Sequence, residues 1–141
     1  MKLLIDTNVV LDVLLRREPY FEYAAKLQVL SEKGYIRNYV SASAVTDTFY
    51  IAKRALNDKK EAIDLLRKFL KTVHIASVTE SNIYEALELQ WSDFEDSVQY
   101  TVGKRILANY IITRNPKDFS KGHIKIMSPK EFIKQIVTNE R

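Results

Sequence analysis

Short apolar runs alternate along the chain with longer stretches in which apolar residues recur every three or four positions. A short apolar run favours a buried strand, and the longer spacing favours an amphipathic helix. The pattern predicts five strands, at residues 2–5, 35–40, 73–78, 110–113 and 124–127. It also predicts seven helices, at residues 9–15, 20–33, 41–56, 59–71, 79–90, 93–107 and 128–137.

Several helix ends carry their own local signals. Gly34 stands where a helix C-terminal glycine is expected, because glycine adopts the left-handed conformation at little cost. Asp58 and Asp93 stand at helix starts, where a carboxylate can accept hydrogen bonds from free backbone N–H groups. Ser128 with Glu131 three residues later has the spacing of a capping box.

The order of elements indicates the fold class. Strands that alternate with helices favour an α/β fold with a central parallel sheet covered by helices on both faces. With only 3 Gly and 3 Pro in 141 residues, long flexible linkers are not expected, so we predict one domain over residues 1–141. In such folds ligands bind beyond the carboxyl ends of the strands.

The residue types that are missing exclude several kinds of chemistry. The chain has no cysteine, so disulfides, thiolate zinc sites and a cysteine nucleophile are excluded. Its 2 histidines are too few and too scattered to form a His-based metal site. The N-terminal apolar run is interrupted by an acid, Asp6, so it lacks the apolar core of a signal peptide. No window is apolar enough for a membrane helix. We therefore expect a cytoplasmic protein that does not enter a membrane.

The charge balance is mildly basic. Lys and Arg number 22 against 18 Asp and Glu, which gives a net charge of +4. Such a surface is compatible with a polyanionic partner and equally with ordinary solvated charge. The basic residues that could line a phosphate groove are Arg16, Arg17, Lys53, Arg54, Lys104, Arg105 and Arg114.

Acidic residues follow the predicted strands. Asp6 ends the first strand, and Asp47 lies about two turns into the helix after the second. Asp93 and Asp96 open the helix before the fourth strand, and Asp118 follows that strand. In a parallel sheet these positions can converge at one edge. Clustered carboxylates repel one another unless a cation lies between them, and hard oxygen ligands suit Mg²⁺ or Mn²⁺.

Each acid also has a plain structural interpretation. Asp93 can simply cap its helix, and Asp118 can be an exposed turn residue. Asp47 is the most informative position, because helix interiors disfavour Asp and its neighbours are mostly apolar. Asp12, Asp58 and Asp64 are predicted to be helix caps or surface charges.

Four segments resemble, in order, the four motifs of the PIN-domain family. The first ends a strand with an acid, the second has a strand followed by a helix with an acid, the third opens a helix with acids, and the fourth follows a strand. These segments are residues 4–12 (LIDTNVVLD), 40–47 (VSASAVTD), 93–99 (DFEDSVQ) and 112–119 (ITRNPKDF).

The resemblance implies a three-layer α/β/α sandwich and a Mg²⁺- or Mn²⁺-dependent endoribonuclease that leaves a 3′ hydroxyl and a 5′ phosphate. By the family pattern the catalytic and metal-binding acids are Asp6, Asp47, Asp96 and Asp118, with Asp93 assisting at the metal. Residues next to the metal ligands or phosphate are Thr7, Asn8, Thr113, Arg114 and Asn115. Many family members of this length are VapC-type toxins that cleave RNA, are inhibited by an antitoxin protein and form homodimers.

Two positions differ from the family pattern or leave a choice within it. The second acid is usually Glu, and Asp47 is one methylene shorter. At the fourth motif the family uses the position of either Asn115 or Asp118, and Asp118 offers the charged oxygen. The alternative function is a catalytically weak PIN module that binds nucleic acid or a protein partner, with an incomplete metal site.

Overall fold

A five-stranded parallel sheet forms the centre of the computed structural model, which describes residues 1–119 and 122–139, with only the backbone at positions 118, 137 and 139. The strand order is β3-β2-β1-β4-β5, so the first strand lies in the middle. The strands are β1 (Lys2–Ile5), β2 (Arg37–Ser41), β3 (His74–Ala76), β4 (Tyr110–Ile112) and β5 (Lys125–Met127).

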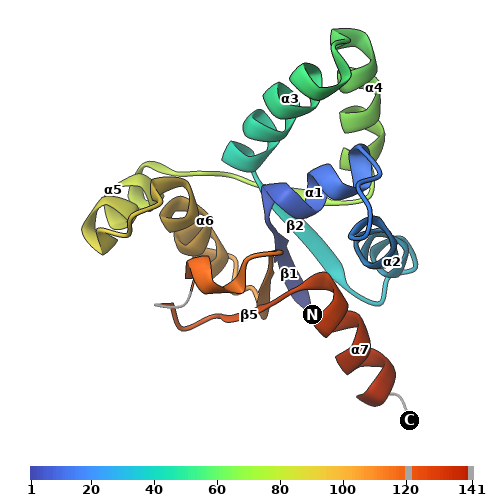
Figure 1. The fold of residues 1–141 in the computed structure, drawn as a ribbon. Coiled ribbons are helices and arrows are strands. Elements are labelled where there is room, and N and C mark those ends of the chain that lie inside the picture. Colours follow the sequence, from blue (N-terminus) through green and yellow to red (C-terminus); the bar gives the residue numbers. More distant parts are fainter. Residues whose placement is uncertain (120–121, 140–141) are drawn as a thin grey trace.

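Helices cover both faces of the sheet (Figure 1). Two lie on one side of it, α5 (Glu80–Leu89) and α6 (Phe94–Arg105). Three lie on the other side, α1 (Thr7–Leu14), α2 (Phe21–Glu32) and α7 (Pro129–Asn139). The pair α3 (Ala42–Leu56) and α4 (Lys59–Leu70) forms a hairpin that extends beyond the sheet next to α1.

The strands alternate their side chains between two hydrophobic cores. Leu3 and Ile5 of β1 pack with α1, α2 and α7, whereas Leu4 packs with α5 and α6. Because successive strand residues point to opposite faces, a strand covered on both sides must be apolar throughout. This explains why residues 3–5 are apolar without interruption, and why the chain forms the predicted three-layer α/β/α sandwich.

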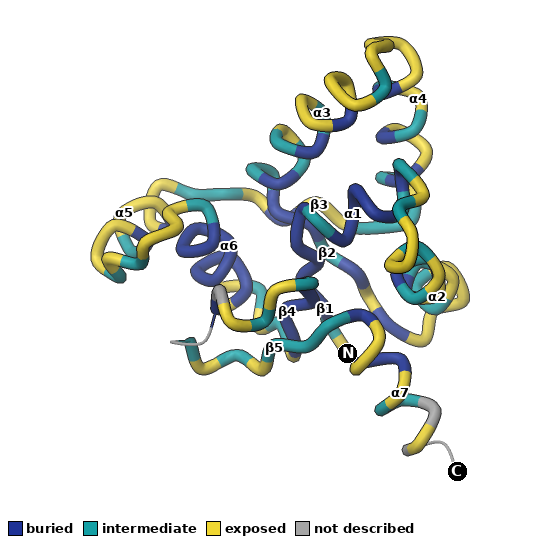
Figure 2. Tube along the Cα trace, viewed as in Figure 1, coloured by how far each residue is buried: buried dark blue, intermediate teal, exposed yellow. Residues whose placement is uncertain are grey.

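Helix α6 is unusual because it is buried along most of its length. Eight consecutive residues, from Asp96 to Gly103, are buried, and the helix shows dark for most of its course in Figure 2. Gly103 allows this close packing, since a Cβ atom there would lie 3.1 Å from Ile124 and 3.4 Å from Leu4. The polar side chains on α6 are thus held inside the protein, where they need polar partners.

All five predicted strands and all seven predicted helices are confirmed, with shifts at their ends. The second strand begins at Arg37 and not at Tyr35, because the chain first turns at Gly34, whose φ is 81°. A short 3-10 helix over Pro116–Phe119 was not predicted. Within the described residues, no helix combines the length and the apolar character that crossing a membrane requires.

Candidate functional site

Asp6 lies at the carboxyl end of β1 and is 7% exposed. One carboxylate oxygen, Oδ1, accepts hydrogen bonds from the backbone N–H of Thr7 at 2.7 Å and from the side chain of Gln99 at 2.8 Å. The other, Oδ2, accepts one from the hydroxyl of Thr113 at 2.7 Å. Asp6 therefore caps α1 and is also held by β4 and α6, so its carboxylate is fixed in place.

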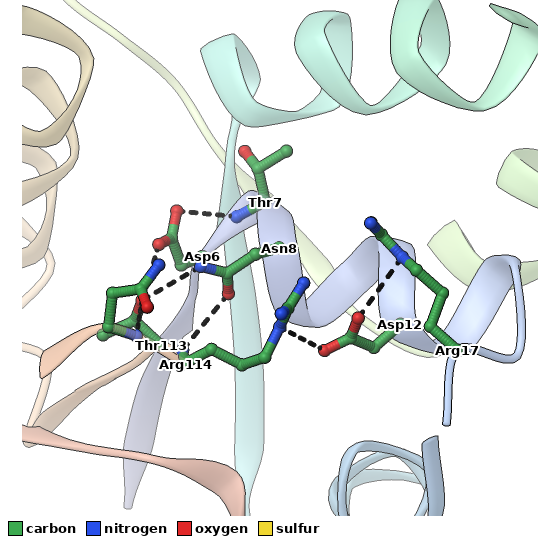
Figure 3. A network of polar contacts seen from close by, with 8 residues as sticks. Asp6, Thr7, Asn8, Asp12, Arg17, Thr113 and Arg114 are labelled. Atoms are coloured by element: carbon green, nitrogen blue, oxygen red, sulfur yellow. Dashed lines mark hydrogen bonds and ion pairs between the residues drawn. The ribbon is translucent and has the colours of Figure 1, made fainter. Parts of the chain in front are cut away.

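Thr113 lies in the loop after β4, and this loop forms hydrogen bonds with α1 (Figure 3). Asn8 donates from its side chain to the Thr113 hydroxyl at 3.3 Å, and its side-chain oxygen accepts from the backbone N–H of Arg114 at 3.3 Å. The backbone N–H of Asn115 also donates to the Thr113 hydroxyl, at 3.2 Å. The first and fourth motifs thus form one hydrogen-bonded unit around Asp6.

Glu95 brings further acids to the same place. It accepts a hydrogen bond from the Thr7 hydroxyl at 3.3 Å. Burial, a hydrogen bond with Asp47, and the negative charges of Asp47 and Asp6 together raise the pKa of Glu95 to about 8. This rise in pKa favours the protonated form of Glu95 in the metal-free site, and the protonated form can donate to Asp47. Glu95 on α6 thus lies near two other carboxyl groups, Asp47 on α3 and Asp6 directly after β1, and the three cannot all ionise without cost.

The remaining predicted acids lie around α6 and after β4. Asp96 directly follows Glu95 and is 8% exposed. Asp93 caps α6, since its carboxylate accepts from the backbone N–H of Asp96 at 3.0 Å. The backbone of Asp118 belongs to the 3-10 helix, but its side chain lies outside the described part of the structure.

The donor set suits a hard divalent cation. Among the described side chains, no three acidic or imidazole groups stand close enough, as placed, to coordinate one ion. The acids nevertheless crowd one another enough to raise the pKa of Glu95, and a cation between them would relieve that repulsion. Oxygen ligands without Cys or His are those that Mg²⁺ and Mn²⁺ prefer.

Asp12 departs from the prediction that it caps a helix or lies on the surface. Its side chain is 0% exposed, and it forms ion pairs with Arg114 Nε at 2.9 Å and Arg17 Nε at 3.4 Å. Burial raises the pKa of Asp12, and the charges of Arg114 and Arg17 oppose that rise. Asp12 lies on the buried face of α1, about 1.7 turns beyond Asp6, so the prediction for this acid was wrong. The predictions for Asp58, which caps α4, and for the exposed Asp64 are confirmed.

Residues 2–117 match the family model described as PIN domain. The chain belongs to the PIN-domain family. Comparison with curated protein sequences gives no match for this PIN domain.

Solved structures support the fold at low sequence identity. A chain of VapBC2 from Rickettsia felis, bound to a promoter DNA fragment, is 15% identical with a TM-score of 0.71, over 91% of this PIN domain and 98% of that chain. A chain of a toxin–antitoxin complex from Klebsiella pneumoniae is 19% identical with a TM-score of 0.66, over 89% of this PIN domain and 96% of that chain. VapC20 from Mycobacterium tuberculosis is a toxin that cleaves the sarcin–ricin loop. It is 14% identical with a TM-score of 0.63, over 77% of this PIN domain and 86% of that chain.

Two residues of the site were missed from the sequence, Glu95 and Gln99. They lie four positions apart on α6, so they share the helix face that points to Asp6 and Thr7. That spacing was the available signal. The resemblance to the third motif pointed instead to Asp96, one position further along. Of the predicted residues, Asp6, Thr7, Asn8, Asp47, Thr113 and Asn115 are brought together by the contacts described above.

Proposed function

We propose that this PIN domain is a Mg²⁺- or Mn²⁺-dependent endoribonuclease. The observation that carries the proposal is that Thr7, at the carboxyl edge of the sheet, donates hydrogen bonds to both Asp6 and Glu95, with Asp47 beside Glu95. Parallel α/β folds bind their ligands at this edge. Carboxylates pressed together in this way are typical of sites that bind divalent cations.

The residues that would hold the ion are Asp6, Asp47, Asp96 and Asp118, with Asp93 and Glu95 beside them. When bound, Mg²⁺ or Mn²⁺ activates water and neutralises charge at a phosphate. Thr113 and Gln99 keep the Asp6 carboxylate in one orientation, and the Thr7 hydroxyl orients Glu95. Asn8 and Asn115 fix the Thr113 hydroxyl, which leaves the carboxylates little freedom to move away from the ion.

Removal of divalent metal is the first test. A panel of labelled single-stranded RNAs and matched DNAs is incubated with the purified protein and EDTA, Mg²⁺ or Mn²⁺. We expect cleavage of RNA in Mg²⁺ or Mn²⁺ and none in EDTA, with products that carry 5′ phosphate and 3′ hydroxyl ends. Cleavage that persists in EDTA, or that yields 2′,3′-cyclic ends, would contradict the proposed chemistry.

RNA contact is supported by two basic residues near the site, Lys53 and Arg54. Other basic residues already have partners within the protein: Lys104 binds Glu85, Arg105 binds the backbone oxygen of Ser77, and Arg16 stacks on Phe21. Within the described residues, no ion pair or hydrogen bond engages the side chains of Lys53 and Arg54. These two residues follow Asp47 on α3 and line an open pocket with Tyr50, Asn57, Asp58 and Lys59.

Replacing both Lys53 and Arg54 with Ala should weaken RNA binding and leave the chemical step intact. Arg54 lies seven residues after Asp47, about 10 Å along the helix, which is the length of about three stacked nucleotides. We expect KM to rise roughly tenfold at low salt with kcat unchanged, and the salt dependence of binding to fall by about one to two counterions. The matched control replaces Lys33 and Arg37 with Ala, because Arg37 begins β2 at the opposite edge of the sheet. An equal effect of both double variants would show only a loss of net charge.

We further propose that the protein acts as the toxin of a toxin–antitoxin pair and forms a homodimer. The likeness to solved toxin–antitoxin complexes supports this proposal. So do exposed apolar side chains on α5, namely Ile83, Tyr84 and Leu87. Light scattering of the purified protein and its effect on cell growth when expressed with and without its neighbouring gene test both parts.

The alternative is a binding module with weak or no catalysis. It is favoured by the shorter Asp47 in place of Glu, and by the lack of three described acids placed to hold one ion. Metal binding separates the two, because a module without a metal site gives no heat with Mn²⁺ in calorimetry and cleaves nothing in the panel.

A further inference from the structure

A buried group of charges lies further along α1 than Asp6 (Figure 3). At its centre is the Asp12 carboxylate, which has no solvent exposure. A buried carboxylate is costly unless cations accompany it, and here two guanidinium groups do so. Arg114 is 2.9 Å away and comes from the loop after β4, whereas Arg17 is 3.4 Å away and comes from the turn after α1.

Arg114 is held on three sides. Its guanidinium carbon lies 4.1 Å from the centre of the Tyr20 ring, within the range of a cation–π contact. Its Nε atom faces Asp12, and its backbone N–H donates to Asn8. The side chain is therefore directed toward α1 and Tyr20 and is 25% exposed.

The neighbours of Arg114 in the chain are the residues that contact the site. Thr113, directly before it, donates to Asp6, and Asn115, directly after it, donates its backbone N–H to Thr113. A shift of the Arg114 backbone is therefore passed directly to Thr113, whose hydroxyl holds Asp6. Arg17 has no such connection, because it shares Asp12 but lies in a different loop.

We propose that Asp12 and Arg114 form a clamp that positions Thr113 against Asp6, and that Arg114 works through this clamp and does not bind substrate phosphate. The expected effect on the rate of RNA cleavage rests on the proposed nuclease function, whereas the expected effect on the position of Thr113 does not. Asp12 and Arg114 are positioning residues, and their effect reaches the site through the Thr113 hydroxyl.

The variants Arg114→Gln and Arg17→Gln make a matched pair, since each removes one cation from Asp12 and keeps a polar side chain of similar reach. Asp12→Asn removes the shared anion, and Arg114→Lys retains the charge without the planar group that stacks on Tyr20. Three readouts are compared with those of the wild type: the thermal unfolding midpoint, the NMR signal of the Thr113 methyl group, and the single-turnover rate with RNA at saturation.

We expect Arg114→Gln and Arg17→Gln to lower the unfolding midpoint by similar amounts, roughly 5–10 °C. Only Arg114→Gln and Asp12→Asn should shift the Thr113 methyl signal and lower the single-turnover rate, by about 10- to 100-fold with little change in KM. The double variant Asp12→Asn/Arg114→Gln should be no slower than either single variant, because both act through one contact. Arg114→Lys should be intermediate.

Three results would overturn the clamp. One is an unchanged Thr113 methyl signal in folded Arg114→Gln. Another is an equal loss of rate in Arg17→Gln, which would point to stability alone. The third is a rise in KM confined to Arg114→Gln with Asp12→Asn unaffected, which would place Arg114 on the substrate. If the wild type cleaves no RNA, the nuclease proposal fails while the NMR comparison still decides the clamp.

Discussion

We expect Asp6→Asn to lower the proposed metal-dependent RNA cleavage by roughly 100- to 1000-fold without unfolding the protein, the loss typical of removing one group that stabilises charge in a transition state. The Asp6 carboxylate accepts three hydrogen bonds, from Thr7, Gln99 and Thr113. An amide at this position retains one oxygen, which still accepts from Thr7 and Gln99. Its NH₂ group replaces the oxygen that accepts from Thr113, and it can donate to the Thr113 oxygen only by displacing the bond from Asn8 or from Asn115. Asn also caps a helix as well as Asp does.

The expected loss therefore comes from the missing charge and not from a damaged fold. Single-turnover cleavage at saturating Mn²⁺ measures the loss, and circular dichroism and the unfolding midpoint check the fold. Asp64→Asn, at an exposed position on α4, is the control for loss of one negative charge. Cleavage by Asp6→Asn at the wild-type rate would remove Asp6 from the metal site and with it the mechanism.

Glu95→Gln should make the metal-free protein more stable at high pH and leave its stability unchanged at low pH. The pKa of Glu95 is about 8 in the folded protein against an ordinary value of 4.5. Its protonated form thus favours the folded state fully below pH 4.5, and that contribution is lost as the pH rises to 8. Gln resembles the protonated acid at every pH and loses nothing. We expect the difference in the free energy of unfolding to grow from near zero at pH 4.5 to about 2 kcal/mol at pH 9, since coupling with Asp47 and partial exposure reduce the full effect.

Chemical denaturation in EDTA across this pH range measures the difference, and Glu88→Gln, at an exposed site on α5, serves as the control. Added Mg²⁺ should narrow the gap at high pH, because a cation offsets the repulsion that the ionised Glu95 meets. Identical pH profiles for Glu95→Gln and the wild type would mean that the three carboxyl groups do not interact as the structure places them.

The fold was predictable because its signals are local. The apolar run of residues 2–5, the helical spacing after it and the caps at Asp58 and Asp93 each depend on neighbours in the chain. The parallel sheet followed from the alternation of strands and helices. The strand order could not be predicted from that alternation, because it depends on which strands lie side by side in space. Apolar runs of similar composition do not indicate which strand pairs with which.

The site was only partly predictable for a related reason. Asp6 stands out because an acid that ends a buried strand is unusual, and motif spacing led to Asp47 and Asp96. Glu95 and Gln99 acquire their roles from the rotation of α6 against the sheet, and Asp12 from the approach of Arg114 across 102 positions. A charged residue inside an apolar helix is a signal of such a partner, but the sequence does not name the partner.

The central place of β1 has a consequence for synthesis of the chain. Asp6 depends on Gln99 and Thr113, which follow it by 93 and 107 positions. A ribosome makes these residues long after Asp6, and strand pairs so distant in sequence form late in folding. The first acid of the site therefore stays without its two distant supports until Gln99 and Thr113 have both left the ribosome. The Asp6 carboxylate thus takes its final orientation late in synthesis, after the helices and strands between these residues have been made.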